Sequence, residues 1–175
     1  MIPRRKLLAS FALSVLCLIP VGFTASVQGV EPAVSEAGTF PFVGLVTGSG
    51  VNLRCGPGRS YEILLQMARM SKLRVLAEQG SWFAAALPEG VPAYIHRSYV
   101  GGVVEGWAPV EGKQVQVRVR PSDGATSWGA LSAPERVRVL GSTGDWIKIQ
   151  PPPFCRGWVH REYVTFLQKE EGASS

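Results

Sequence analysis

The sequence predicts an all-β protein made of two tandem copies of one small barrel. The C-terminal two-thirds of the chain repeats itself at a spacing of 64 residues. Short stretches rich in Val and Ile alternate with polar residues at a period of two, which is typical of half-buried strands. Glycine-containing turn signals separate these stretches at short intervals. Each copy then has about five short strands and no long helix, which implies a compact, strongly bent barrel.

The repeat is defined by three motifs that recur at a fixed spacing, and such a period indicates two copies of one unit. A fourth motif, Val51–Arg54, aligns with Val117–Arg120 at a spacing of 66, which requires small offsetting gaps. The three motifs at a spacing of 64 are Arg74-Val75-Leu76 with Arg138-Val139-Leu140, Gly80 and Trp82 with Gly144 and Trp146, and His96-Arg97-x-Tyr99-Val100 with His160-Arg161-x-Tyr163-Val164.

Individual strands follow from the alternation. Val115, Val117 and Val119 alternate with Gln116, Arg118 and Arg120. The segment 61–70 is mildly helical in pattern, but we interpret it as a loop followed by a strand. The run Pro151-Pro152-Pro153 is expected in a hairpin loop before Cys155.

Residues 1–29 have the features of a secretory signal. The basic stretch Arg4-Arg5-Lys6 precedes a largely apolar run from Leu7 to Ile19, and small residues follow. This run is short for a membrane span, which needs roughly 20 residues. We expect cleavage and export to the periplasm or the extracellular space; an uncleaved segment would instead anchor the protein in the membrane. Residues 30–41 are expected to form a spacer and residues 167–175 a flexible tail.

The charge balance argues against a nucleic-acid partner. The chain has 18 Lys and Arg and 13 Asp and Glu, a net charge of +5. Three of these bases lie in the signal segment, and without them the net charge is +2. Phosphate binding needs clustered excess cations, so nucleic acid is not an expected partner.

Two cysteines, Cys55 and Cys155, lie outside the signal segment. An even number of cysteines in an exported protein is compatible with a disulfide. Each of them occurs in only one copy, so a bridge would join the two copies by closing a loop of about 100 residues. Two free buried thiols are the alternative, and the spacing does not choose between them.

The two histidines, His96 and His160, are considered as catalytic groups because a Cys–His pair can act as a nucleophile. Both, however, occupy the same position of the repeat, which the fold explains more simply than catalysis does. No Cys-x-x-Cys or His-x-x-x-His spacing indicates a metal site. We therefore expect no catalytic residue, no metal, no cofactor and no enzymatic activity.

Both copies resemble the bacterial SH3-like (SH3b) domain family. The first copy opens with Val51-Asn52-Leu53-Arg54-x-Gly56-Pro57-Gly58-x-Ser60-Tyr61, and the second ends with Gly157-Trp158-Val159 and Tyr163-Val164. The resemblance implies SH3-like barrels at 42–101 and 107–166. The chain departs from the family pattern where the first copy has Ala93-Tyr94 in place of Gly-Trp and the second lacks the Asn and the Gly-Pro-Gly.

Aromatic side chains are the preferred candidates for a binding surface. SH3-like barrels display aromatic rings between their loops, where they can hold an extended peptide or a sugar face. Trp82 and Trp146 are expected to be largely structural. In this alignment Tyr61, Trp82, Tyr94 and Tyr99 match Trp128, Trp146, Trp158 and Tyr163. The candidate ligand-binding residues are Tyr61, Trp128, Tyr94 and Trp158, with Asn52, Arg54 and Arg120 as polar contacts to carboxylates of peptidoglycan stem peptides.

Three functions remain open at this point. The first is an exported, non-enzymatic protein that binds cell-wall peptidoglycan peptides. The second is an envelope scaffold that docks an extended peptide of a partner protein. The third is a targeting subunit for a separate cell-wall hydrolase. The resemblance favours the first, but fold-level analogy is weak support for function, and the oligomeric state is left open.

Overall fold

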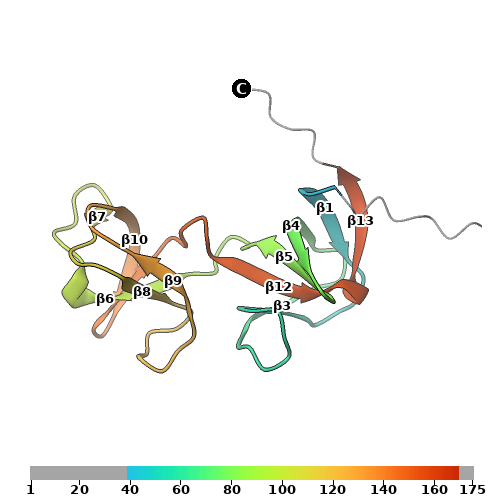
Figure 1. Cartoon of the computed structure of the whole chain (residues 1–175), viewed down its shortest axis with the longest axis horizontal. Helices are drawn as coiled ribbons and strands as arrows, with labels where there is room; N and C mark the ends of the chain where they lie inside the picture. Colours follow the sequence, from blue (N-terminus) through green and yellow to red (C-terminus); the bar gives the residue numbers. More distant parts are fainter. Residues whose placement is uncertain (1–38, 170–175) are drawn as a thin grey trace, which may run out of the picture. The chain divides into compact units, whose positions relative to one another are not determined.

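The computed structural model describes residues 39–169, and within them it confirms the all-β prediction (Figure 1). Two short 3-10 turns, η1 (Arg97–Tyr99) and η2 (Arg161–Tyr163), interrupt the strands. The signal segment 1–29 lies outside the described residues. The strands are β1 Phe42–Val46, β2 Val51–Arg54, β3 Ile63–Met67, β4 Lys72–Gln79, β5 Trp82–Ala86, β6 Ala93–His96, β7 Trp107–Pro109, β8 Val115–Arg118, β9 Ser127–Leu131, β10 Arg136–Thr143, β11 Trp146–Ile149, β12 Arg156–His160 and β13 Val164–Lys169.

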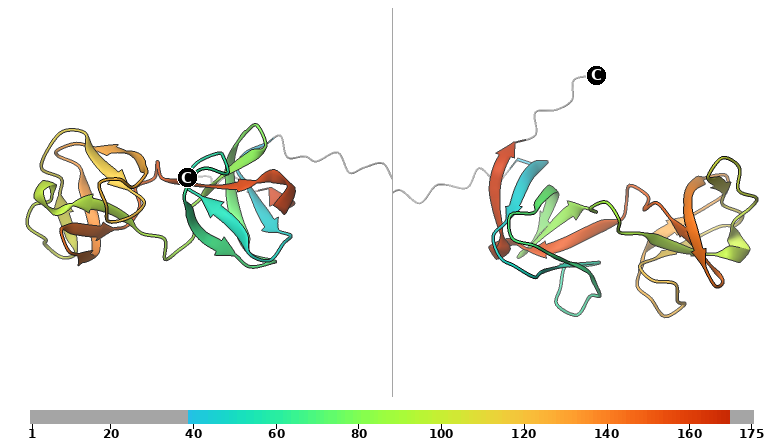
Figure 2. Two further views of the ribbon diagram at one scale, coloured as in Figure 1. Left: turned by 90° about the horizontal axis from the view of Figure 1, so that it is seen from below. Right: turned by 180° about the vertical axis from the view of Figure 1, so that it is seen from behind.

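The strands form two sheets, and neither sheet is built from one contiguous copy. The first barrel has the order β13-β1-β4-β5-β12-β2-β3, and the second has the order β7-β10-β11-β6-β8-β9. The two C-terminal strands, drawn in red, therefore lie among the N-terminal strands, with β13 beside β1 (Figure 2). This composition differs from the expected contiguous barrels at 42–101 and 107–166.

The exchange of strands between the copies is reciprocal and keeps one register. In the first barrel β5 pairs with β12, which places Trp82 opposite His160. In the second barrel β11 pairs with β6, which places Trp146 opposite His96. The second copy thus contributes β12 to the first barrel, and the first copy contributes β6 to the second barrel. In contiguous barrels each of these strands would lie in the barrel of its own copy.

The connections that precede the exchanged strands explain this topology. Residues 87–92 join β5 to β6 and contain Pro88 and Pro92, and residues 150–155 join β11 to β12 and contain Pro151-Pro152-Pro153. Proline fixes φ near −65° and restricts the preceding residue to extended conformations. Each connection contains one turn, closed by a hydrogen bond from Val91 N–H to Pro88 C=O or from Cys155 N–H to Pro152 C=O. The strands on either side of the turn do not pair with each other, and the chain runs on to the neighbouring barrel. The proline run therefore lies in a crossover connection and not in the predicted hairpin loop.

Exchanged strands contribute to both hydrophobic cores. The core of the first barrel includes Phe42, Leu53 and Val75, and the exchanged Val159 is fully buried within it. The core of the second includes the exchanged Ile95, which is also fully buried. A smaller buried cluster brings together Cys55, Val119 and Ala125 from both copies.

The register also corrects the sequence alignment. Arg54 pairs with Ile63 in the first barrel and Arg118 with Ser127 in the second, so the 64-residue spacing holds here without gaps. The alignment of Val51–Arg54 with Val117–Arg120 at a spacing of 66 was wrong. Hydrogen bonds from Cys55 N–H to Glu62 C=O and from Val119 N–H to Thr126 C=O repeat at the same spacing. The counterpart of Arg54 is therefore Arg118, the counterpart of Arg120 is Gly56, and Tyr61 corresponds to Ala125 and not to Trp128.

The ends of the described segment are more ordered than the spacer and tail predictions implied. Phe40, in the predicted spacer, packs against Phe42 with ring centroids 5.6 Å apart. Strand β13 continues to Lys169, so residues 167–169 belong to the sheet rather than to a tail. Among the residues that the structure describes, no helix has the length and apolar character needed to cross a membrane.

Candidate functional site

Each barrel carries a pocket beside its Trp–His pair. The first-barrel pocket has a volume of about 310 Å³ and is lined by Trp82 of β5 together with His160 and Tyr163. The rings of Trp82 and His160 meet edge to face, with centroids 5.3 Å apart and planes at 87°. Tyr163 extends this aromatic wall, since its ring lies 6.2 Å from that of His160. The polar lining consists of Asn52, Arg54, Arg59 and Glu162.

The polar groups of the first-barrel pocket are only partly satisfied within the protein. Arg54 donates from one guanidinium nitrogen to the C=O of Tyr61 at 2.8 Å. Nδ1 of His160 lies 3.3 Å from Oε1 of Glu162, which is ion-pair distance. The two atoms are not aligned for a hydrogen bond, and this buried nitrogen has no hydrogen-bond partner among the described residues. Arg59 is exposed at the rim.

The charges of Glu162 and Arg59 act on the pKa of Tyr163 in opposite directions. A hydrogen bond to Glu162 and the negative charge of that carboxylate raise the pKa of the Tyr163 hydroxyl, while the charge of Arg59 lowers it. Tyr163 thus keeps its proton at neutral pH.

The second-barrel pocket repeats the aromatic wall with different polar groups. Its volume is about 210 Å³, and Trp146 meets His96 edge to face at 5.4 Å and 86°. Nδ1 of His96 lies 2.8 Å from the Ser98 hydroxyl, so here the imidazole has a neutral partner where His160 has a carboxylate. The remaining lining residues are Tyr99, Lys113, Gln114, Val115, Gln116, Arg118 and Asp123.

Both pockets are composite because of the strand exchange. In the first-barrel pocket His160, Glu162 and Tyr163 come from the second copy, and the other lining residues come from the first. In the second-barrel pocket His96 and Tyr99 come from the first copy. Each wall is therefore formed by two distant parts of the chain.

The candidate residues from the sequence are divided among several places. Asn52 and Arg54 line the first-barrel pocket. Tyr94 and Arg120 line a different hollow, beside β3. Tyr61 is exposed, and its ring lies over Gly56.

The two remaining aromatic candidates are half-buried and line none of these cavities. Trp128 donates from Nε1 to the C=O of Arg156 at 3.0 Å. Trp158 is paired with Arg54 across the sheet.

Sequence reasoning missed the histidines and the tyrosines beside them as pocket residues. His160 was considered as a catalytic group and then interpreted as a repeated scaffold position. Tyr163 was aligned with the other aromatic residues but not chosen as a candidate, and Trp82 and Trp146 were expected to be largely structural. Trp146 is indeed buried, with 9% exposure, whereas Trp82 is half-buried. The available signal was the joint recurrence of Gly-x-Trp and His-Arg-x-Tyr-Val at one spacing, which places the three rings in one wall once the strands pair.

The two cysteines are free thiols in separate buried clusters, so the disulfide considered between Cys55 and Cys155 is not formed in this structure. Burial raises the pKa of Cys55, and it raises the pKa of Cys155 to about 12. A thiol that keeps its proton is a poor nucleophile. The described residues contain no group of three or more His, Cys, Asp or Glu side chains placed to hold a metal ion.

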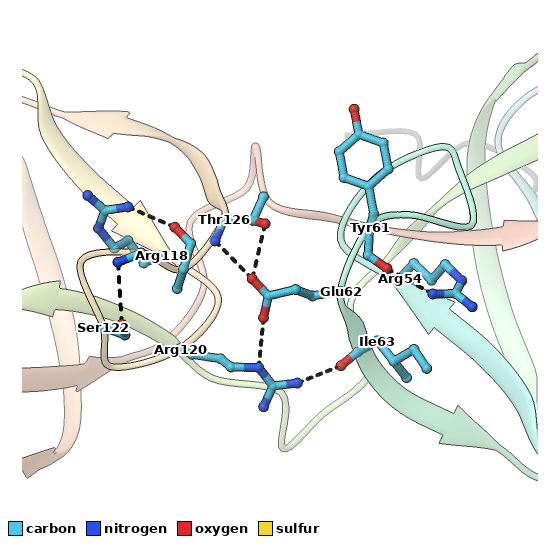
Figure 3. A network of polar contacts seen from close by, with 10 residues as sticks. Arg54, Tyr61, Glu62, Ile63, Arg118, Arg120, Ser122 and Thr126 are labelled. Atoms are coloured by element: carbon cyan, nitrogen blue, oxygen red, sulfur yellow. Dashed lines mark hydrogen bonds and ion pairs between the residues drawn. The ribbon is translucent and has the colours of Figure 1, made fainter.

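A polar cluster joins the two copies at Glu62 (Figure 3). Oε1 of Glu62 accepts from the backbone N–H of Thr126 at 3.0 Å and from its hydroxyl at 3.1 Å. Oε2 accepts from Nε of Arg120 at 2.7 Å, and Arg120 also donates to the C=O of Ile63 at 2.9 Å. The Thr126 N–H is the main reason why the pKa of Glu62 is lowered, with Arg120 adding to it. Arg120 therefore acts as an inter-copy contact.

Comparison with protein families agrees with the fold. Residues 113–165 match the family model described as "Bacterial SH3 domain", which confirms the resemblance for this part of the chain. The matched segment runs from before β8 into β13, so it includes strands that the structure divides between the two barrels. No curated protein matches the chain.

Proposed function

We propose that this protein is an exported, non-enzymatic wall-binding protein that recognises peptidoglycan stem peptides through its two composite pockets. The observation that carries the proposal is the repeated Trp–His–Tyr wall, with one arginine beside it in each pocket. This arginine is Arg54 of β2 in the first-barrel pocket and Arg118 of β8 in the second. Flat rings suit the backbone of an extended peptide, and arginine suits its carboxylates. The first-barrel pocket is the preferred site because it is larger and has Arg59 at the rim.

The absence of catalysis is part of the proposal. Protonated, buried thiols support a structural role for Cys55 and Cys155. The edge-to-face contact of each histidine ring with a tryptophan ring supports a packing role for the histidines rather than a catalytic one. Export is proposed from the signal-like segment 1–29, with the mature protein in the periplasm or outside the cell.

Co-sedimentation of the purified protein with peptidoglycan sacculi tests this function. Tyr163→Ala and Tyr99→Ala each remove one exposed ring from one pocket without opening a core. Each is expected to weaken binding at its own pocket by about tenfold, as for a truncated aromatic contact. The double variant is expected to stay in the supernatant.

Tyr61→Ala is the matched control, since Tyr61 is exposed to the same degree as Tyr163, 41% each, but lies outside both pockets. The control should pellet like the wild type, and all variants should unfold at similar temperatures. Failure of the wild type to pellet, or pelleting of the double variant at the wild-type level, would refute binding through these pockets.

A further inference from the structure

A third hollow, separate from both pockets, lies beside β3 at the edge of the first sheet. Its volume is about 370 Å³. Leu64 and Leu65 of β3, Gly90 and Val91 of the crossover connection, and Tyr94 of β6 form most of its apolar wall. None of these five residues lines the two Trp–His–Tyr pockets.

The second barrel shows what fills the corresponding space. At a spacing of 64 residues, Gly129 of the edge strand β9 corresponds to Leu65, and Phe154 of the other crossover connection corresponds to Gly90. The Phe154 ring is seated on Gly129 so closely that a methyl group added there would lie 3.1 Å from the ring. An aromatic side chain of the chain itself therefore covers β9.

The first barrel lacks this internal cover. Gly90 has no side chain, and a methyl group added there would meet no atom within 4 Å. Leu65 occupies part of the space, but the hollow remains open between β3 and the crossover connection. At this edge the second barrel has Gly129 and Phe154 where the first has Leu65 and Gly90, so the ring that covers β9 has no counterpart over β3.

We propose that the hollow beside β3 receives an aromatic side chain from an extended segment of a partner protein. The position of Phe154 identifies the class of side chain that this surface fits. An edge strand also offers unpaired backbone groups to an added strand, which favours an extended partner segment. The guanidinium of Arg120 at the rim is engaged by Glu62 and by the C=O of Ile63, so the ring and the backbone carry the recognition.

The test is an NMR titration of the purified protein with a capped pentapeptide that has a central phenylalanine and four alanines. The all-alanine pentapeptide is the matched probe. We expect saturable shifts of the Leu64, Leu65 and Val91 amides with the first peptide and none with the second. The same amides unmoved by the phenylalanine peptide, or moved equally by both peptides, would overturn the proposal.

Two variants sharpen the titration. Phe154→Ala empties the space on Gly129, so a second binding event is expected there, with new shifts of the Gly129 and Trp128 amides. Val91→Phe places a ring in the first hollow and is expected to weaken binding beside β3 by about tenfold or more. Because Val91 is half-buried in a connection, this variant tests the proposal even if Phe154→Ala does not fold. Unchanged affinity in Val91→Phe would contradict it. Both Trp–His–Tyr pockets are untouched, so wall binding is tested separately.

Discussion

The two barrels share one register and fill it with side chains of different size. In the first barrel Gly157 lies against Leu53, and a methyl group added at Gly157 would lie 2.8 Å from the Leu53 side chain. In the second barrel the same two positions hold Ala93 and Val117, both fully buried. Relative to the first barrel, the second has a side chain one carbon smaller at the β2 position, Val117 for Leu53, and one carbon larger on the exchanged strand, Ala93 for Gly157. The comparison teaches that the departure of the first copy from the Gly-Trp motif compensates for a smaller partner residue.

A second pair of positions shows the same exchange of volume between a buried small residue and an exposed large one. Gly56 leaves room for the ring of Tyr61, since an added methyl group would lie 2.3 Å from a ring carbon. The counterparts are Arg120 and Ala125, so the small residue has moved to the other position. The freed arginine then reaches Glu62 of the first copy. The exchange of volume at Leu53 and Gly157 keeps the packing of the two cores similar. The exchange at Gly56 and Tyr61 gives the second copy an arginine contact that the first copy does not have.

The largest effect is expected from Gly157→Ala. Because Leu53 is fully buried, it cannot swing away from the new methyl group, and overpacking a core costs about 1–3 kcal/mol of unfolding free energy. Chemical denaturation measures this loss. Combining Gly157→Ala with Leu53→Val copies the second barrel and should cost less than the two single changes together. Strictly additive costs would show that the side chains at positions 53 and 157 do not compensate for each other.

The fold was predictable because hydrophobic periodicity and turn signals are local properties. Repetition of Arg-Val-Leu and Gly-x-Trp indicated matching strands in both copies. The strand exchange was not predictable, because Trp82–His96 and Trp82–His160 pairings satisfy the same local pattern. Only the direction in which the two proline-rich connections run distinguishes them. The same ambiguity hid the pockets, whose His160 and Tyr163 are remote in sequence from Asn52 and Arg54.

Glu62→Gln tests the hydrogen bonds between Glu62 and Thr126. These two residues occupy the same position of the repeat, one in each copy. Loss of the charge weakens three hydrogen bonds at a half-exposed site, and we expect a loss of about 1 kcal/mol of unfolding free energy. Glu78→Gln is the matched control, because the Glu78 side chain is exposed to a similar degree, 30% against 32%, but accepts one hydrogen bond, from Arg161, among the described residues. Equal losses in the two variants would contradict a special role for Glu62.

The same contact gives a pH dependence of defined sign. The pKa of Glu62 is lowered from its ordinary value of 4.5, mainly by the Thr126 N–H. A carboxylate of this kind stabilises the fold at pH values above 4.5, and the stabilisation disappears as the pH falls through the lowered pKa of the folded state. The stability difference between wild type and Glu62→Gln should therefore shrink in acid. A difference that stays constant between pH 7 and pH 2 would exclude this explanation.

Gly56→Ala is expected to cost less than Gly157→Ala, although its added methyl group comes closer to a neighbour. Tyr61 is 41% exposed, so its ring can rotate into solvent. Gly56 itself is buried, but the neighbour that must move is an exposed ring, so we expect a loss of about 1 kcal/mol, at the low end for overpacking. Thermal unfolding measures it, and Gly56→Ala combined with Tyr61→Ala should show no additional loss. A cost equal to that of Gly157→Ala would mean that Tyr61 is fixed in place.

The smallest effect concerns charge at the pocket rims. Arg59 of the first-barrel pocket corresponds to Asp123 of the second, so the rim charge is reversed. Arg59→Asp should weaken binding to sacculi by a few-fold, and Asp123→Arg should strengthen it by a similar factor, since exposed charges contribute about 0.2–1 kcal/mol. Both effects should fade at high salt. Opposite signs would assign wall binding to cationic rather than acidic groups of the polymer.

Cross-strand nuclear Overhauser effects distinguish the exchanged strands from two barrels that each close on themselves. Antiparallel partners bring their backbone protons within reach of one another. The exchanged structure predicts contacts between Ala84 and Trp158 and between Lys148 and Tyr94. Contacts between Ala84 and Tyr94 and between Lys148 and Trp158 would show instead that each copy closes its own barrel.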